Sequence, residues 1–232
     1  MNIDSGDEYI CYGEDKMGID ILTRKLVNNR SFVWNVVKRT KNYSVCEIDD
    51  SAIFKGCIVK NNGENNKLIV SESSKISFCT FCFNGNGNTV FIEANVEVNG
   101  CVFLMDDDNN AIRIGKDTTF TGKTEIIANE GTEITIGTDC MFAYGIVLRS
   151  GDHHSILNEY GKRVNLARSI VIGNHVWIGQ NAFIMKNVHI SDGCVVGACS
   201  VVTKDIAEVN TIVAGNPAKK IKGNISWDRH RI

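Results

Sequence analysis

The sequence contains a single proline, Pro217, and it has no excess of positive charge. Its 25 lysines and arginines are set against 27 aspartates and glutamates, so it lacks the basic surplus that holds a nucleic acid backbone or an anionic membrane surface. No segment approaches the roughly 18 uninterrupted apolar residues of a membrane span, and the first ten residues lack the basic and apolar regions of a signal peptide. These absences predict a cytoplasmic protein with no nucleic acid partner and no membrane span.

The nine cysteines are an odd number, which argues against a disulfide framework. In a reducing compartment, cysteines serve more simply as small buried side chains. The 232 residues, 43% of them hydrophobic, are enough for one large domain or for a domain with a small appendage.

An internal repeat is the strongest signal in the sequence. Aliphatic residues recur every 22 positions at Val70, Ile92, Ile114 and Ile136, and cysteines and asparagines follow the same interval. The matching columns are Leu68, Val90, Ile112 and Ile134; Cys57, Cys79 and Cys101; and Asn66, Asn88 and Asn110.

The repeat is interrupted once and then shortens. The next equivalent residue, Ile172, follows Ile136 by 36 positions, which is 14 more than the 22-residue interval. Beyond it, aliphatic residues recur every six positions, at Ile172, Ile178, Ile184, Ile190, Val196 and Val202.

An apolar residue at every sixth position fits neither an α-helix nor a long alternating strand. It fits a coil of three short strands, each with one aliphatic side chain pointing inward, stacked on neighbouring coils as parallel sheets. The 22-residue coils then have one longer corner, where stretches such as "NGNGN" and "DDDNN" tolerate left-handed backbone conformations. The sequence therefore predicts an all-β solenoid with 22-residue coils followed by 18-residue coils.

The motifs "IGNHVWIGQNAFI", "VGACSVVTKDI" and "AGNPAKKIK" resemble those of the hexapeptide-repeat acyltransferases, and in particular the O-acetyltransferases of sugars and of capsular polysaccharides such as polysialic acid. The resemblance implies a left-handed parallel β-helix, an exception to the usual right-handed crossover. It also implies a homotrimer with sites between subunits. The expected organisation is an N-terminal cap region (1–45), the β-helix (46–215) with an extruded loop (149–166), and a C-terminal tail (216–232).

The loop explains the interruption of the repeat. Members of the family extrude a loop just before the "WIG" coil, with a histidine in an "H-[PS]-[ILV]" context, and His154 in "HSI" matches it. A neutral imidazole is suited to removing a sugar hydroxyl proton at neutral pH, so His154 is the expected general base and Asp152 the carboxylate that orients it. His153 is the alternative base if the loop register is shifted by one residue. His175, in "GNHVW", lies on the polar side of a hexad and could approach the site, but a surface role is favoured for it.

Acetyl-CoA is the expected co-substrate, and no metal is expected. By resemblance, Trp177, Gly179 and Gln180 are expected to contact its acetyl end. Ala198, Thr203 and Lys204 are expected to contact its pantetheine arm. Pro217 is expected to contact its adenine, and Lys219 and Lys222 its phosphates. A covalent route through Cys199 is the competing mechanism, but a buried packing role is expected for this cysteine.

The expected reaction is O-acetylation of a glycan acceptor, a bacterial capsule or lipopolysaccharide, with Arg149 and Tyr144 as candidates for binding an anionic acceptor. Alternatives within the enzymes are an N-acetyltransferase of a nucleotide sugar and an antibiotic-modifying acetyltransferase. Alternatives of another class are a β-helical zinc hydrolyase, which needs three converging histidines, and a non-catalytic scaffold.

Overall fold

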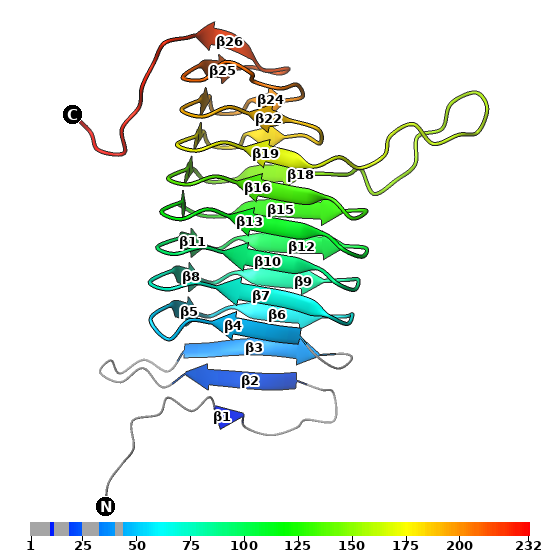
Figure 1. Ribbon diagram of the computed structural model, residues 1–232, viewed down its shortest axis with the longest axis vertical. Coiled ribbons are helices and arrows are strands. Elements are labelled where there is room, and N and C mark those ends of the chain that lie inside the picture. Colours follow the sequence, from blue (N-terminus) through cyan, green and yellow to red (C-terminus); the bar gives the residue numbers. More distant parts are fainter. Residues whose placement is uncertain (1–9, 12–18, 25–32, 40–43) are drawn as a thin grey trace, which may run out of the picture.

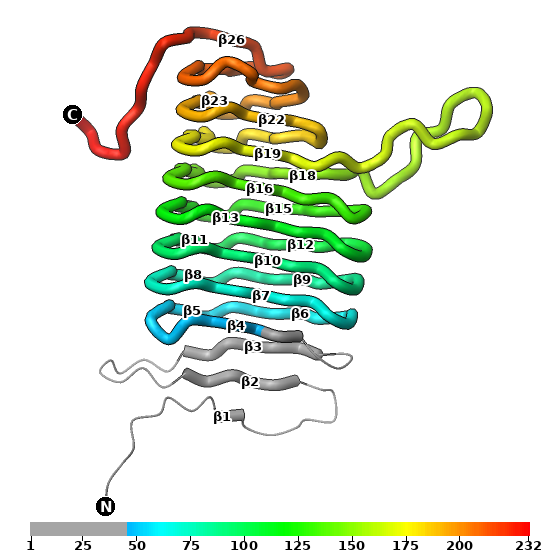
Figure 2. Tube along the Cα trace, viewed as in Figure 1, coloured from blue at the N-terminus to red at the C-terminus, as the bar shows by residue number. Residues whose placement is uncertain are grey.

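A computed structural model describes residues 10–11, 19–24, 33–39 and 44–232. Its described residues form strands and turns without any helix, stacked as successive coils of one column (Figures 1 and 2). None of them belongs to a helix long and apolar enough to cross a membrane.

Each complete coil contributes one strand to each of three sheets. The ten-stranded sheet contains β1 (Ile10–Cys11), β2 (Ile19–Arg24), β3 (Val33–Arg39), β6 (Ile58–Asn61), β9 (Thr80–Phe83), β12 (Val102–Asp106), β15 (Thr124–Asn129), β18 (Ile146–Arg149), β21 (Phe183–Ile184) and β24 (Val201–Val202). The seven-stranded sheet contains β4 (Ser44–Ile48), β7 (Asn66–Val70), β10 (Thr89–Ile92), β13 (Ala111–Ile114), β16 (Glu133–Ile136), β19 (Ile170–Ile172) and β22 (His189–Ile190). The nine-stranded sheet contains β5 (Ile53–Lys55), β8 (Lys75–Ser77), β11 (Glu97–Asn99), β14 (Thr119–Phe120), β17 (Met141–Phe142), β20 (Trp177–Ile178), β23 (Val195–Val196), β25 (Ile212–Ala214) and β26 (Lys219–Lys222).

The strand register confirms the predicted periods. Val90 pairs with Leu68 and Ile112 at intervals of 22 residues, and Trp177 pairs with Val195 at an interval of 18. Ile134 pairs with Ile170, 36 positions later, so the surplus residues leave the column between these two strands.

Inward-facing aliphatic and aromatic side chains fill the interior of the column. Leu68, Val90, Ile112, Ile134 and Ile170 are at most 1% exposed. Phe81 and Phe103 stack with ring centroids 4.6 Å apart, and Phe120 and Phe142 stack at 4.4 Å. Stacking of identical side chains adds about 0.5–1.5 kcal/mol per aromatic pair beyond the area that the pair buries.

The corners are made by residues in the left-handed region, as the sequence predicts. Asn65, Gly87, Asn109 and Gly131 have φ values of 58°, 67°, 58° and 70°, and they recur every 22 residues. Asparagine and glycine adopt this conformation at low cost, which allows the chain to turn between flat strands.

Among the N-terminal strands, β2 runs in the opposite direction to the coils above it. β3 pairs in parallel with β6, whereas β2 pairs antiparallel with both β1 and β3. The segments "GIDILTRKLVNN" and "SFVWNVVKR" of the predicted cap contain β2 and β3. Apart from β1, β2, β3 and the start of β4, the predicted cap lies outside the described residues, and the predicted domain boundaries stay predictions.

The cysteine prediction holds for most of the column and fails at one corner. Cys57, Cys79, Cys101, Cys140 and Cys194 are buried, and Cys46 and Cys82 are only partly buried. Cys199, expected to be a buried packing residue, is exposed, because it occupies a corner with a φ of 57° rather than an inward position of a strand.

Candidate active site

The extruded loop leaves the column between β18 and β19, at the corner where the ten-stranded sheet meets the seven-stranded sheet (Figure 1). The two ends of the loop are tied together, since the Arg168 N–H donates to the Ser150 carbonyl oxygen at 2.8 Å. The buried Ser150 hydroxyl accepts hydrogen bonds from the Thr132 hydroxyl at 2.6 Å and from the Asn129 N–H at 2.9 Å. The loop therefore has a fixed root on the column.

Its outer part is a small hairpin with exposed apolar side chains. The Val164 N–H donates to Ile156 O, and the Asn158 N–H donates to Lys162 O, both at 2.9 Å. The large exposed apolar residues on it are Ile156, Leu157, Tyr160, Val164 and Leu166.

The two loop histidines have different surroundings. His153 has a φ of 60°, and its Nδ1 lies 3.3 Å from Asp106 Oδ2 and 3.4 Å from Asn129 Nδ2. His154 is exposed, and its backbone carbonyl accepts a hydrogen bond from Asn165 Nδ2 at 2.8 Å. One imidazole is thus held against the column, and the next points its side chain to solvent from a fixed backbone.

Asp152 binds the loop root rather than the His154 imidazole. Lys186 Nζ donates to Asp152 Oδ2 at 2.5 Å, and Asn165 Nδ2 donates to the same oxygen at 2.8 Å. The hydrogen bond from Lys186 is the main cause that lowers the pKa of Asp152 below its usual value, with the Asn165 hydrogen bond acting in the same direction. The orienting role that the sequence assigns to Asp152 stays a prediction.

A second ion pair holds the far side of the root. Arg163 Nη2 donates to Glu130 Oε1, and this hydrogen bond lowers the pKa of Glu130. Asn165, which is 8% exposed, links this side to the histidine side, because its Oδ1 accepts from the Ile156 N–H at 2.7 Å. Five polar side chains, those of Asp152, Lys186, Asn165, Arg163 and Glu130, therefore fix the root of the loop.

The residues expected to bind acetyl-CoA occupy several faces of the upper coils. Trp177 and Gly179 are at β20, in the nine-stranded sheet, and Gln180 and Ala198 follow at the next corner. Thr203 and Lys204 come directly after β24, and Pro217, Lys219 and Lys222 lie in or beside β26. One chain does not gather all of them on a single surface.

Among these residues, Trp177 is 38% exposed. A Cβ atom at Gly179 would lie 2.6 Å from the Ala198 nitrogen, so the stacking of coils is by itself enough to require glycine there.

The two acceptor candidates lie at opposite ends of β18. Arg149 is the last residue of that strand, next to the loop, whereas Tyr144 precedes it, at the corner with the nine-stranded sheet. Tyr144 lines a pocket of about 240 Å³ together with the polar residues Lys123, Glu125 and Asn181 and the apolar Ile146 and Val147. The structure therefore separates the two residues that the sequence grouped.

The loop and Trp177 also lie at different corners of one chain. Between them along the chain is β19, which spans the seven-stranded sheet. Within a single chain, the loop histidines and the exposed indole are consequently separated by the width of a face.

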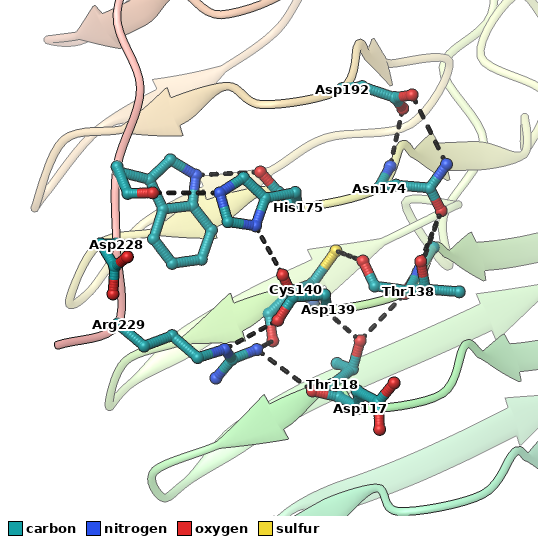
Figure 3. Close-up of polar contacts among 12 residues, drawn as sticks. Asp117, Thr118, Thr138, Asp139, Cys140, Asn174, His175, Asp192, Asp228 and Arg229 are labelled. Atoms are coloured by element: carbon teal, nitrogen blue, oxygen red, sulfur yellow. Dashed lines mark hydrogen bonds and ion pairs between the residues drawn. The ribbon is translucent and has the colours of Figure 1, made fainter.

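A group of residues that the sequence reasoning missed lies at the C-terminal tail. Trp227 and Arg229 dock on the column against His175 and Asp139 (Figure 3). His175 is a surface residue, with its side chain 39% exposed, although the tail packs on one face of its ring. The one signal in the sequence was a tryptophan in an otherwise polar tail, "NISWDRHRI".

Comparison with known proteins adds the family. The family described as bacterial transferase hexapeptide (six repeats) matches residues 169–204. Among solved structures, the polysialic acid O-acetyltransferase OatWY is 35% identical, with 81% of this chain and 88% of that chain covered and a TM-score of 0.77. Among curated proteins, a polysialic acid O-acetyltransferase of Escherichia coli O1:K1 / APEC is 41% identical over 91 residues, which are 39% of this chain and 29% of that protein. A chloramphenicol acetyltransferase of Klebsiella aerogenes is 55% identical over 56 residues, 24% of this chain and 26% of that protein.

The stacked coils built from six-residue repeats, the extruded loop and the match with OatWY along most of both chains define the class. The chain belongs to the hexapeptide-repeat acyltransferases, enzymes built on a left-handed parallel β-helix. Within this family, it resembles a polysialic acid O-acetyltransferase over most of its length, while the matches with the two curated relatives named above each span less than a third of the relative.

Proposed function

We propose that the protein transfers an acetyl group from acetyl-CoA to a sugar hydroxyl of a bacterial surface polysaccharide, with polysialic acid as the first acceptor to test. The observation that carries this proposal is the similarity to the polysialic acid O-acetyltransferase OatWY, at 35% identity and a TM-score of 0.77. The use of acetyl-CoA favours a cytoplasmic reaction.

His154 is the proposed general base. Its exposed imidazole takes the proton of the sugar hydroxyl while the oxygen attacks the thioester carbonyl carbon. The carbon–sulfur bond then breaks, and the departing CoA thiolate receives the proton from the imidazolium. A positioned base of this kind contributes about 10²- to 10⁴-fold to the rate.

The surroundings of His154 favour a division of roles with His153. Asp106 and Asn129 hold the His153 ring beside the column, and Asp152 is held by Lys186 and Asn165. These contacts fix the backbone on both sides of the His154 Cα atom, so its ring is presented from a preorganised segment. If His153 were the base instead, Asp106 would be the carboxylate that orients its Nδ1.

Assembly into a homotrimer is part of the proposal. A histidine and an indole at different corners of one chain can form one site if the loop of one copy reaches the nine-stranded sheet of the next. The exposed apolar residues of the hairpin, among them Leu157 at 57% and Tyr160 at 84%, give the loop a surface to bury against a second copy.

In this arrangement, the CoA molecule lies between two copies. Trp177, Gly179 and Gln180 contact its acetyl end, Ala198, Thr203 and Lys204 its pantetheine arm, and Pro217 its adenine. Lys219 and Lys222, both exposed in β26, are placed to meet its phosphates with positive charge. Arg149, beside the loop root, and Tyr144 remain the proposed contacts of an anionic acceptor.

The test is mass spectrometry of acceptors incubated with the protein and acetyl-CoA. We expect polysialic acid to gain 42 Da adducts, about the mass of an acetyl group, that mild base removes as it does an ester, whereas an amide would survive that treatment. Chloramphenicol is included because of the local similarity to its acetyltransferase, and an amino-sugar nucleotide is included as an amine acceptor. Acetylation of either one, with the polysaccharide unmodified, would overturn the proposed acceptor.

His154→Ala should lower kcat by about 10²- to 10⁴-fold while acetyl-CoA still binds. Tight binding of a partner protein together with unchanged turnover in His154→Ala would support a scaffold instead.

A further inference from the structure

The C-terminal tail lies along one corner of the column, between the seven-stranded and nine-stranded sheets. The successive corner residues there are Asp117, Asp139 and His175, with φ values of 60°, 54° and 53°. Figure 3 shows Arg229 of the tail beside Asp117 and Asp139, and Trp227 stacks on His175 one coil further along. The tail therefore contacts three consecutive coils at equivalent positions.

Arg229 is the lower anchor of the tail. Its guanidinium donates to Asp139 Oδ1 at 2.8 Å, to Thr119 Oγ1 at 2.7 Å, to Cys140 O at 2.8 Å and to Asp117 O at 3.1 Å. The planar guanidinium suits such a fan of acceptors, which the single ammonium of a lysine cannot satisfy at once.

Trp227 is the upper anchor, and it binds His175 in three ways. The two rings stack with centroids 4.0 Å apart and planes at 7°. Trp227 Nε1 donates to His175 O at 2.9 Å, and His175 Nε2 lies 3.1 Å from Trp227 O. The other ring nitrogen, Nδ1, lies 2.6 Å from Asp139 Oδ2, so the same aspartate serves both anchors.

Trp227 also reaches the indole of Trp177. The two indole rings lie 6.1 Å apart at 50°, within the range of favourable tilted aromatic pairs. Trp177 begins β20 two residues after His175, and its side chain is 38% exposed. Burial alone therefore does not fix the Trp177 ring, and the tail supplies an aromatic neighbour.

We propose that Trp227 is a positioning residue for acetyl-CoA: anchored through His175 and Arg229, it holds the Trp177 indole in the orientation that receives the acetyl end of the co-substrate. This inference rests on the proposed function, which places Trp177 in the acetyl-CoA site. Fixing one aromatic side chain before binding is worth about two- to tenfold in affinity.

The effect falls on binding of the co-substrate, because Trp227 touches Trp177 and none of the loop residues. Trp227→Ala is expected to raise both the KM for acetyl-CoA and its dissociation constant by about two- to tenfold. The kcat at saturating acetyl-CoA and the KM for the acceptor stay within about twofold of the wild type. Trp227→Phe, which keeps an aromatic ring but loses the Nε1 donor, should recover part of the affinity.

Arg229→Lys and Arg231→Lys form the matched pair. Both retain the charge, but only Arg229 has the four hydrogen bonds to the column, while Arg231 is exposed. Calorimetric titration of the full chain with acetyl-CoA should show weakened binding for Arg229→Lys and wild-type binding for Arg231→Lys. Hydrogen exchange of residues 225–230 should be faster in Arg229→Lys than in Arg231→Lys.

Three results separate this inference from the proposed function. Wild-type acetyl-CoA affinity in both Trp227→Ala and Arg229→Lys overturns the positioning role and leaves the proposed function intact. A lower kcat, a higher acceptor KM and a lower thermal stability in the same variants also overturn it, because together they indicate a general folding role. Failure of the wild-type chain to bind acetyl-CoA overturns the proposed function and the positioning role together, while the exchange measurement still reports separately whether the tail docks.

Discussion

Lys186 and Asp152 form an ion pair across the root of the extruded loop, with Nζ 2.5 Å from Oδ2 and both side chains less than a third exposed. Lys186 follows β21 on the column, and Asp152 is the second residue before His154. This pair therefore connects the rigid coils to the segment that presents the proposed base.

Removing the lysine should loosen the loop. Lys186→Met leaves the half-buried Asp152 carboxylate without its cationic partner, and hydrogen bonds to charged groups contribute about 1.5–3 kcal/mol. We expect hydrogen exchange in residues 152–166 to accelerate by about tenfold or more, and turnover to fall. Lys162→Met, which changes an exposed lysine of the hairpin, is the control and should leave both unchanged. Equal exchange in the two variants would refute a role of the ion pair in holding the loop.

The two loop histidines can be separated by single substitutions. His154→Ala should lower kcat by about 10²- to 10⁴-fold with little change in thermal stability, because the side chain is an exposed proposed base. His153→Ala should cost less activity, since its contacts with Asp106 and Asn129 act on the position of the loop. Steady-state kinetics on both variants show which histidine contributes more to kcat. The reverse order of effects would make His153 the base.

The ion pair also predicts a pH dependence. The pKa of Asp152 is lowered from its usual 3.8, so the folded state binds this proton less readily than the unfolded state does. Its contribution to stability is therefore present above about pH 4 and is lost as the pH falls through the depressed pKa. Thermal unfolding of the wild type and of Asp152→Asn should differ most near neutral pH, and the two curves should converge toward pH 3. A difference that stays constant down to pH 3 would contradict the assignment.

The aromatic stack in the core gives a stability prediction. Phe103 is fully buried against Phe81, so Phe103→Ala should lower the free energy of unfolding by about 3–5 kcal/mol. Phe103→Leu keeps most of the volume and should cost about 1.5 kcal/mol or less. Denaturant titration measures both values. Similar losses for the two variants would indicate that ring volume is not what fills this layer.

Much of the fold can be predicted from the sequence because each coil repeats the same pattern of inward-facing aliphatic residues. The 22-residue columns through Val90 and Ile112 and the 18-residue spacing from Trp177 to Val195 follow directly from the aliphatic period. The displaced position of Ile170 likewise locates the loop, since a surplus of residues between two paired strands has to leave the column.

The candidate site was only partly predictable. The resemblance located the loop histidines and Trp177, but it did not indicate that Asp152 pairs with Lys186 or that Tyr144 and Arg149 lie at opposite ends of β18. Nor did it reveal that Trp227 docks on His175, 52 residues away. These contacts join segments that share no period, so a repeat analysis has no register in which to align them.

The amino-acid sequence by itself determined the coil length, the inward columns, the left-handed corners and the place of the loop. These features depend on side chains that contact similar side chains one coil above and below, and such contacts produce a regular period in the sequence. Only the tertiary structure decided which charges fix the loop root, and that the tail folds back onto the corner of Asp117, Asp139 and His175. These contacts depend on the three-dimensional path of irregular segments, where one arginine or tryptophan can bind residues of several coils at once.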